Sequence, residues 1–141
     1  STENVKKGAY VLADGDENAT EKCEVILIAT GSEVHLALAA REQLLTLGIK
    51  ARVVSAPCLE WFLQQPISYQ EQVLPKKIRA RVSIEAGIAQ SWYQFIGDAG
   101  VPVSLEHFGA SASASVLFKE FGFTVENVVK AAKESISKAH G

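Results

Sequence analysis

The chain reads VILIATGSE at residues 25–33, and this stretch decides its fold class. Residues 25–29 are continuously apolar and rich in β-branched types, which is typical of a strand buried on both faces of a parallel sheet. Beyond them, apolar residues recur at helical spacing from Val34 to Leu45, and Gly48 is a natural stop for a helix. We therefore expect a central strand that leads through a short turn into a helix.

Strand and helix patterns alternate on both sides of this unit. Residues 59–73 suit one or two short helices, interrupted by Pro66. Thr124 is a good N-cap for a last helix, whose apolar stripe includes Val128 and Ile136. Further strands are expected at residues 9–12, 51–55, 79–85 and 101–105, with another helix at 89–96.

This alternation indicates parallel strands joined by right-handed crossovers. We predict an α/β fold of three layers, in which helices cover both faces of an open twisted sheet of about five strands. The sheet is mostly parallel with the first strand antiparallel, and the architecture is Rossmann-like. A single domain over residues 1–141 is expected, and the abrupt start suits a domain taken from a longer polypeptide.

Composition and charge exclude several classes of function. The 14 basic and 16 acidic side chains give a formal charge of -2, so no broad positive field is available for nucleic acid. The longest apolar runs fall far short of the roughly 20 residues that span a bilayer, so no membrane segment is expected. The polar first residues lack the apolar core of a secretory signal, and we predict a cytoplasmic protein. Cys23 and Cys58 are expected to be ordinary reduced thiols.

The turn after the central strand is the candidate binding site, because such turns offer free amide groups to phosphate or carboxylate. The glycine spacing of a dinucleotide fingerprint and the Gly-Lys pair of a P-loop are both missing. A capping box is favoured instead, and the carboxylate would repel an anion from the positive helix terminus. The turn is therefore predicted to be at most a weak anion crevice, formed by Thr30, Gly31, Ser32 and Glu33.

Metal chemistry finds little support in the residue pattern. Asp14, Asp16 and Asn18 have the spacing of the first ligands of a calcium loop, but Ala19 stands where that loop needs glycine. His35 has no second ligand one helical turn away. We predict no metal ligands and no cofactor-binding residues.

Nucleophilic catalysis is weakly suggested near the C-terminus. Residues 109–113 place Ser111 in a pattern close to the nucleophile elbow of α/β-hydrolases, but Ser113 replaces the final glycine. Glu106 and His107 are adjacent on an expected strand end, so their side chains point to opposite faces. A loop and helix-cap role is favoured for the serines, and no catalytic residue is predicted.

A basic stretch precedes the expected strand at residues 79–85. It contains Lys76, Lys77, Arg79 and Arg81. A solvated face is the favoured interpretation, and an interdomain salt-bridge surface or a sugar-phosphate contact remain as alternatives.

Several segments of the chain, from about residue 8 to 136, together form a specific pattern. They are residues 28–34 (IATGSEV), 56–62 (APCLEWF), Tyr69 to 73–75 (VLP), 85–89 (EAGIA) with Trp92 and Tyr93, 107–112 (HFGASA) and 121–124 (FGFT). With these segments in this order, the chain resembles the C-terminal domain of transketolases. Ser113 departs from the pattern, because many transketolases have proline at that point. Related thiamine enzymes, including the pyruvate dehydrogenase β chain, are similar in fold, but the Phe-Gly-containing segments resemble transketolase more.

This resemblance implies a two-carbon ketol transfer between sugar phosphates, carried out by the whole enzyme with thiamine diphosphate and a divalent metal, Mg²⁺ or Ca²⁺. It also implies that the cofactor lies between the two preceding domains at a dimer interface. The present domain would contribute no catalytic residue and would be inactive alone. Its partners would be those preceding domains and the homodimer mate.

Three alternatives remain open. One is a freestanding α/β module that binds a small anion or nucleotide at residues 30–33. Another is a small hydrolase that uses Ser111. The third is the C-terminal domain of a related thiamine diphosphate enzyme.

Overall fold

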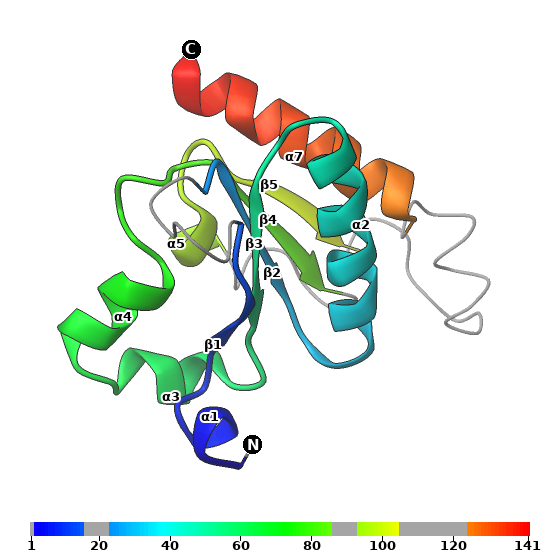
Figure 1. Ribbon diagram of the computed structural model, residues 1–141. Coiled ribbons are helices and arrows are strands. Elements are labelled where there is room, and N and C mark those ends of the chain that lie inside the picture. The colour runs from blue at the N-terminus through cyan, green and yellow to red at the C-terminus, as the bar shows by residue number, and fades with distance from the viewer. Residues whose placement is uncertain (1, 16–22, 86–92, 105–123) are drawn as a thin grey trace.

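The computed structural model describes residues 2–15, 23–85, 93–104 and 124–141, and a single mixed sheet forms its centre (Figure 1). Among these residues the sheet has five strands in the order β1-β3-β2-β4-β5. β1 runs antiparallel to β3, and the other pairs are parallel. The predicted fold class is confirmed. The strands are β1 (Tyr10–Ala13), β2 (Val25–Ala29), β3 (Ala51–Ser55), β4 (Arg81–Glu85) and β5 (Val101–Ser104).

Helices cover both faces of this sheet. One face carries α2 (Val34–Thr46) and α7 (Val125–His140), which pack on each other and on the strands. Figure 1 shows the shorter helices, α3 (Leu59–Leu63), α4 (Ile67–Val73) and α5 (Tyr93–Ile96), on the opposite side. A 3-10 turn, η2 (Gly31–Glu33), leads from β2 to α2, and α1 (Thr2–Lys6) precedes β1.

β2 is the central strand, as its apolar run predicts. All five of its residues are buried, and its side chains alternate between two hydrophobic clusters. Leu27 belongs to the cluster beneath α2 and α7, whereas Ile26 and Ile28 belong to the cluster beneath α3 and α5. Because both faces need cover, no polar alternation is possible along this strand.

The last helix, α7, follows its sequence pattern closely. The Thr124 side chain accepts a hydrogen bond from the Asn127 amide at 3.2 Å, so the predicted N-cap is confirmed. Val128 and Ala132 are fully buried, and Lys130 on the other side of the helix is exposed. The helix therefore packs by its apolar stripe.

Ser135 joins α7 to the start of β4 and to the turn before β5. Its hydroxyl accepts a hydrogen bond from the Arg81 amide at 2.8 Å and donates to the Ala99 carbonyl at 2.6 Å. β5 first pairs with β4 at Val82, so the Arg81 amide lies one residue before the β4–β5 pairing begins. The Ser135 hydroxyl gives this amide a hydrogen-bond acceptor. A fully buried serine on an apolar stripe is explained by this role, because an unpaired buried amide would be costly.

Some element bounds differ from the sequence-based expectation. α1 was not predicted from the polar start of the chain. β4 begins at Arg81 instead of residue 79, and the Arg79 side chain turns away to the Asp98 carboxylate and the Ala139 carbonyl. α5 covers the second half of the helix predicted at 89–96, and the first half lies outside the described residues.

Candidate functional site

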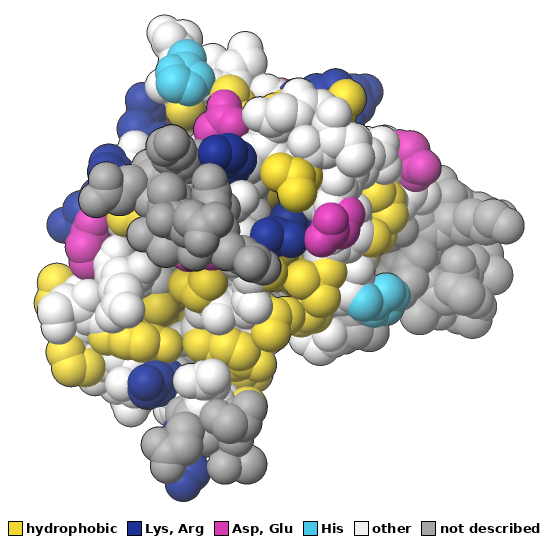
Figure 2. Space-filling view, in the orientation of Figure 1, with side chains coloured by type: hydrophobic (Ala, Val, Ile, Leu, Met, Phe, Trp, Pro, Cys, Tyr) yellow, Lys and Arg dark blue, Asp and Glu magenta, His cyan; other side chains and the backbone are white. Residues whose placement is uncertain are grey.

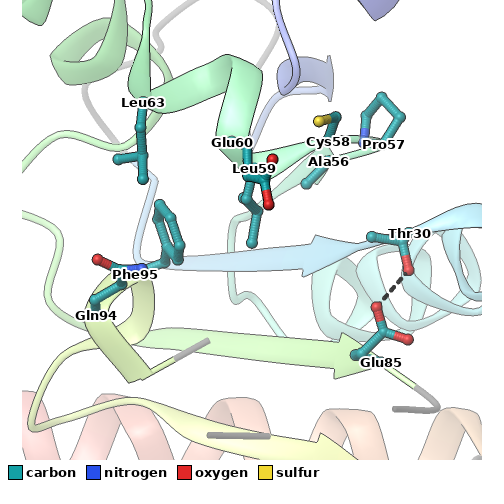
Figure 3. A pocket seen from close by; sticks show the side chains of 10 residues that line it. All are labelled: Thr30, Ala56, Pro57, Cys58, Leu59, Glu60, Leu63, Glu85, Gln94 and Phe95. Carbon is teal, nitrogen blue, oxygen red and sulfur yellow. Dashed lines mark hydrogen bonds between the residues drawn. The ribbon is translucent and has the colours of Figure 1, made fainter. Parts of the chain in front are cut away.

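The carboxyl ends of β2, β3 and β4 meet at one edge of the sheet, where α/β proteins bind ligands. A cavity of about 500 Å³ lies there, between the strand ends and the helices α3 and α5. Thr30 follows β2, Cys58 follows β3, and Glu85 ends β4, while Leu63 and Phe95 contribute apolar walls (Figure 3). The predicted turn therefore lies beside a cavity, and its first residue, Thr30, lines that cavity.

Thr30 and Glu85 form the polar contact of this cavity. The Thr30 hydroxyl donates to Oε2 of Glu85 at 2.9 Å, as Figure 3 shows. The parallel register explains the contact, because Ala29 lies opposite Ile84 and the next residues follow side by side. Both side chains are half-buried, so the hydrogen bond fixes the carboxylate at the edge of the sheet.

The Thr30 side chain does not make the hydrogen bond predicted for it in the capping box. Thr30 has the extended backbone of an N-cap, and its carbonyl accepts from the Glu33 amide at 3.0 Å, but its side chain caps nothing. The physical reason is the neighbouring strand, since Glu85 offers a charged acceptor and hydrogen bonds to charged groups are about twice as strong as neutral ones. Glu33 is buried, with 6% of its surface exposed.

The charges around the cavity are unfavourable for anions. Glu60 and Glu85 both line it, and the described residues that form its wall include no Lys, Arg or His. A phosphate in this cavity would lie close to two carboxylates, whose like charge repels it. An anion crevice at residues 30–33 therefore stays a prediction, and the charges support weak binding.

Titration with inorganic phosphate is expected to produce no saturating amide shifts at Gly31 to Val34 below about 1 mM. Glu85→Gln removes one carboxylate but keeps an acceptor for Thr30, so it should tighten any binding that is present. Amide-shift titrations of the two proteins make the comparison. Saturation of the wild-type chain at micromolar phosphate would show that the crevice is a true anion site.

The two cysteines are free thiols, as expected. Cys23 is buried and its Sγ donates to the Val25 carbonyl at 3.0 Å. Burial raises the pKa of the Cys23 thiol, an effect only partly opposed by hydrogen bonding and charge from Arg52. A buried thiol with a raised pKa is a poor nucleophile at neutral pH. Cys58 is half-buried and lines the cavity.

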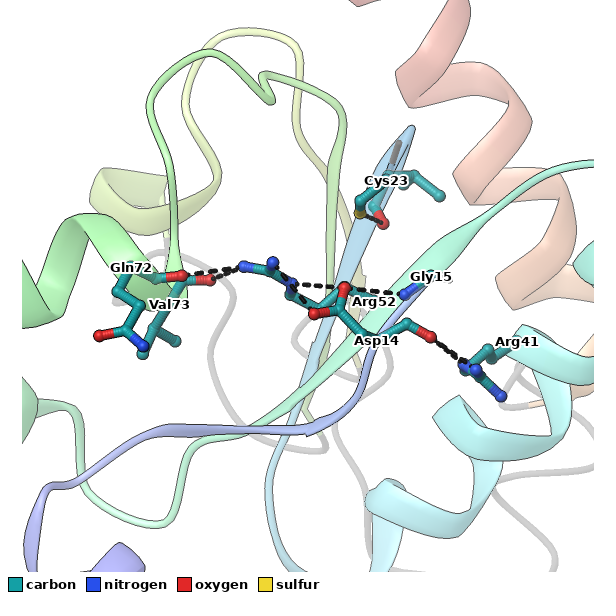
Figure 4. Close-up of polar contacts among 8 residues, drawn as sticks. Asp14, Gly15, Cys23, Arg41, Arg52, Gln72 and Val73 are labelled. Atoms are coloured by element: carbon teal, nitrogen blue, oxygen red, sulfur yellow. Dashed lines mark hydrogen bonds and ion pairs between the residues drawn. The ribbon is translucent and has the colours of Figure 1, made fainter. Parts of the chain in front are cut away.

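Asp14 forms an ion pair with Arg52 (Figure 4). Its carboxylate accepts from Nε of Arg52 at 3.1 Å and from Nη2 at 3.3 Å, and also from the Gly15 amide at 2.8 Å. Arg52 points its remaining donors at the Gln72 and Val73 carbonyls, both at 3.0 Å, where α4 ends. The sequence analysis did not single out Arg52. The available signal was its position inside an expected strand, where the structure buries every residue. Asp16 and Asn18 lie outside the described residues.

The basic stretch at residues 76–81 divides into two kinds of side chain. Arg81 is half-buried and donates to four carbonyls, those of Ile78, Phe95, Leu74 and Pro75, at 2.6–3.2 Å. Burial lowers the pKa of Arg81, and the charge of Glu71 acts in the opposite direction. Arg81 therefore ties the ends of α4 and α5 together. The solvated-face interpretation holds for Lys76, Lys77 and Arg79, which are exposed.

Other predicted features cannot be placed or are not brought together. Glu106, His107, Ser111 and Ser113 lie outside the described residues. His35 is exposed on α2. Within the described ranges, no three His, Cys, Asp or Glu side chains converge as metal ligands, and no helix is long and apolar enough to cross a bilayer.

Comparison with known families identifies the domain. The family model described as "Transketolase-like TK C-terminal domain" matches residues 8–124. The chain belongs to the transketolase family. The match spans the sheet and the cavity edge, so the architecture described above is that of a transketolase C-terminal domain.

Curated transketolases are similar to the chain over nearly all of its length. The transketolase of Mycobacterium leprae (strain TN) is 52% identical over 134 residues, which cover 95% of this chain and 19% of that protein. Transketolase 1 of Escherichia coli (strain K12) is 53% identical over 131 residues, covering 93% of this chain and 19% of that protein. The chain thus spans 19% of the length of these relatives.

Solved transketolases share the fold. The transketolase from Leishmania mexicana superposes with a TM-score of 0.85 and 38% identity, covering all of this chain and 20% of that chain. A Pichia stipitis transketolase gives a TM-score of 0.84 at 36% identity, covering 97% of this chain and 19% of its own. A chain described as a split gene transketolase in an inactive beta4 tetramer shares the fold alone, with a TM-score of 0.69 and 20% identity.

Proposed function

We propose that this chain is the C-terminal architectural domain of a transketolase and that other parts of the polypeptide carry the chemistry. The observation that carries the proposal is the 52% identity to a whole transketolase over 95% of this chain, against only 19% of the relative. The proposed domain unit is residues 1–141, placed behind preceding domains of the same polypeptide.

For the whole enzyme we propose transfer of a two-carbon ketol unit between sugar phosphates. Solved Pichia stipitis transketolases in complex with sedoheptulose-7-phosphate and xylulose-5-phosphate are similar to this chain, which supports substrates of that class. We further propose that the enzyme uses thiamine diphosphate and Mg²⁺ or Ca²⁺, that it is a homodimer, and that it is cytoplasmic.

The described residues of this chain do not fit the cofactor. Thiamine diphosphate carries negative phosphates, and the cavity at the sheet edge is lined by the carboxylates of Glu60 and Glu85. Arginine is a common phosphate ligand, but the Arg81 guanidinium donates its hydrogen bonds to backbone carbonyls. These contacts support an architectural role, in which polar side chains are used to join elements and not to bind ligands.

The test is calorimetry of the isolated chain with thiamine diphosphate and magnesium, followed by an assay of ketol transfer. We expect no heat of binding and no turnover, because binding needs a diphosphate site that the described residues do not form. A complete transketolase serves as the positive control in both measurements. Micromolar cofactor affinity of the isolated chain would overturn the proposed division of labour.

A further inference from the structure

A small pocket lies at the amino ends of β4 and β5, at the opposite edge of the sheet from the cavity described above. It lies between the loop that leads from α4 to β4 and the turn that leads from α5 to β5. Its volume is about 170 Å³, below the roughly 300 Å³ at which pockets for drug-sized ligands begin, so a small ion suits it better than a nucleotide. The described residues that line it are Lys76, Arg79, Arg81, Ile96, Gly97 and Asp98.

Positive charge predominates among these six residues, which we call the basic pocket. Lys76, Arg79 and Arg81 supply three cations. Asp98 supplies the one carboxylate among the described lining residues, so the positive charges exceed the negative charge by two. Figure 2 shows Lys and Arg side chains along the edge of the molecule where the loop between α4 and β4 lies in Figure 1.

The Arg81 guanidinium is a half-buried charge whose hydrogen bonds go to neutral groups. It donates to the Phe95 carbonyl at 2.6 Å and to the Pro75 carbonyl at 2.9 Å, and burial lowers its pKa. Glu71, whose charge raises that pKa, lines a neighbouring groove. Burial has removed part of the hydration of this cation, so an anion that comes near it stabilises it. Arg81 can therefore attract an anion by its charge while it keeps its bonds to the carbonyls.

Arg79 already binds one anionic group at this pocket. Its Nη2 donates to both carboxylate oxygens of Asp98, at 3.2 and 3.3 Å, and its Nη1 donates to the Ala139 carbonyl at 3.1 Å. The hydrogen bond and the charge of Arg79 lower the pKa of Asp98. Both side chains of the ion pair are exposed, so water weakens it and a more highly charged anion can compete for Arg79.

We propose that the basic pocket binds a phosphate group, as the free ion or as part of a small phosphate ester. Lys76 and Arg79 donate hydrogen bonds to its oxygens, and Arg81 contributes its charge. A phosphate group carries a charge of about -1.5 to -2 at pH 7, which matches the two positive charges in excess, whereas a carboxylate would balance only one of them. The inference does not depend on the proposed function, because it uses only residues of this chain.

Amide-shift titrations of the chain with inorganic phosphate and with glycerol 3-phosphate test the proposal. At low ionic strength we expect saturating shifts at residues 76–81 and 97–99, with a Kd of about 1 mM or lower for at least one of the two ligands. The physical reason is that charge-assisted hydrogen bonds are strong and salt does not screen them under these conditions. Tighter binding of glycerol 3-phosphate would identify a site for phosphate esters, and tighter binding of inorganic phosphate would identify a site for the free ion.

Two variants of the basic pocket should change the Kd in opposite directions. Arg79→Gln removes a donor and a positive charge, so it should weaken binding about tenfold. Asp98→Asn removes the competing carboxylate and leaves Arg79 available, so it should tighten binding several-fold. The matched control is Lys130→Gln, which removes an exposed cation from α7 and should leave the Kd within about twofold of the wild-type value. All three side chains are exposed, so the variants should stay folded.

Three results would overturn the proposal. One is the absence of saturating shifts at residues 76–81 and 97–99 up to about 20 mM of either ligand. Another is a Kd that Arg79→Gln changes no more than Lys130→Gln does, because binding would then reflect only the general surface charge. The third is an Asp98→Asn variant that binds no more tightly than the wild-type chain, since a pocket that accepts a phosphate must gain from the loss of its carboxylate.

Discussion

Val128→Asp is expected to destabilise the chain by roughly 4 kcal/mol or more, enough to remove most of the stability of a domain of this size. Val128 is fully buried in the hydrophobic cluster that joins α2, α7 and the sheet. A carboxylate there would be desolvated without a partner, or would take up a proton at a comparable cost. The measurement is the thermal or urea unfolding transition of the isolated chain.

Lys130→Asp is the matched control for this variant. It places the same carboxylate on the same helix, two residues further on, but at an exposed position. Its midpoint should lie close to that of the wild-type chain, because exposed charges contribute little. A Val128→Asp midpoint equal to that of the control would mean that α7 does not pack by its apolar stripe.

Gly8→Ala is expected to cost about 3 kcal/mol, through strain in the backbone and a collision with α3. Gly8 has a φ of +84°, in the region that side chains rarely adopt. A Cβ atom at this position would also lie 2.2 Å from the Cys58 carbonyl oxygen and 2.3 Å from the Phe62 amide. The collision is with backbone, so no rotation of a side chain can relieve it.

Gly48→Ala separates these two contributions. Gly48 has a similar φ of +79°, but nothing lies within 4 Å of the position that its Cβ would occupy. We expect a loss of only about 1 kcal/mol, from backbone strain alone. Urea unfolding of the two variants measures the difference. If Gly8→Ala were no less stable than Gly48→Ala, the residues before β1 would not be held on α3.

Features that depend on neighbouring residues were predictable from the sequence. The apolar run at residues 25–29 requires cover on both faces, and β2 has it. Thr124 caps α7 through a group three residues away, so both partners lie within one turn. Pro66 divides α3 from α4 because proline cannot continue a helix.

Features that join distant residues were not predictable in this way. Thr30 looked like half of a capping box, but its hydroxyl bonds Glu85, which is 55 positions away and becomes its neighbour only through the parallel pairing of β2 and β4. The calcium-like spacing around Asp14 gave no hint of Arg52, which is 38 positions away. Arg81 looked like part of a basic surface, and its four carbonyl partners come from the ends of α4 and α5 and the turn before β4.

The sequence by itself thus determined the α/β class, the central strand and the last helix, and its similarity to transketolases covers most of the chain. These properties depend on hydrophobic periodicity and on capping, which act over a few residues. Only the tertiary structure decided that Glu60 and Glu85 line one cavity at the carboxyl ends of the strands and that Arg52 and Arg81 bond to carbonyl groups of other elements. The physical reason is that strand pairing and helix packing, and not spacing along the chain, choose which charged and apolar side chains become neighbours.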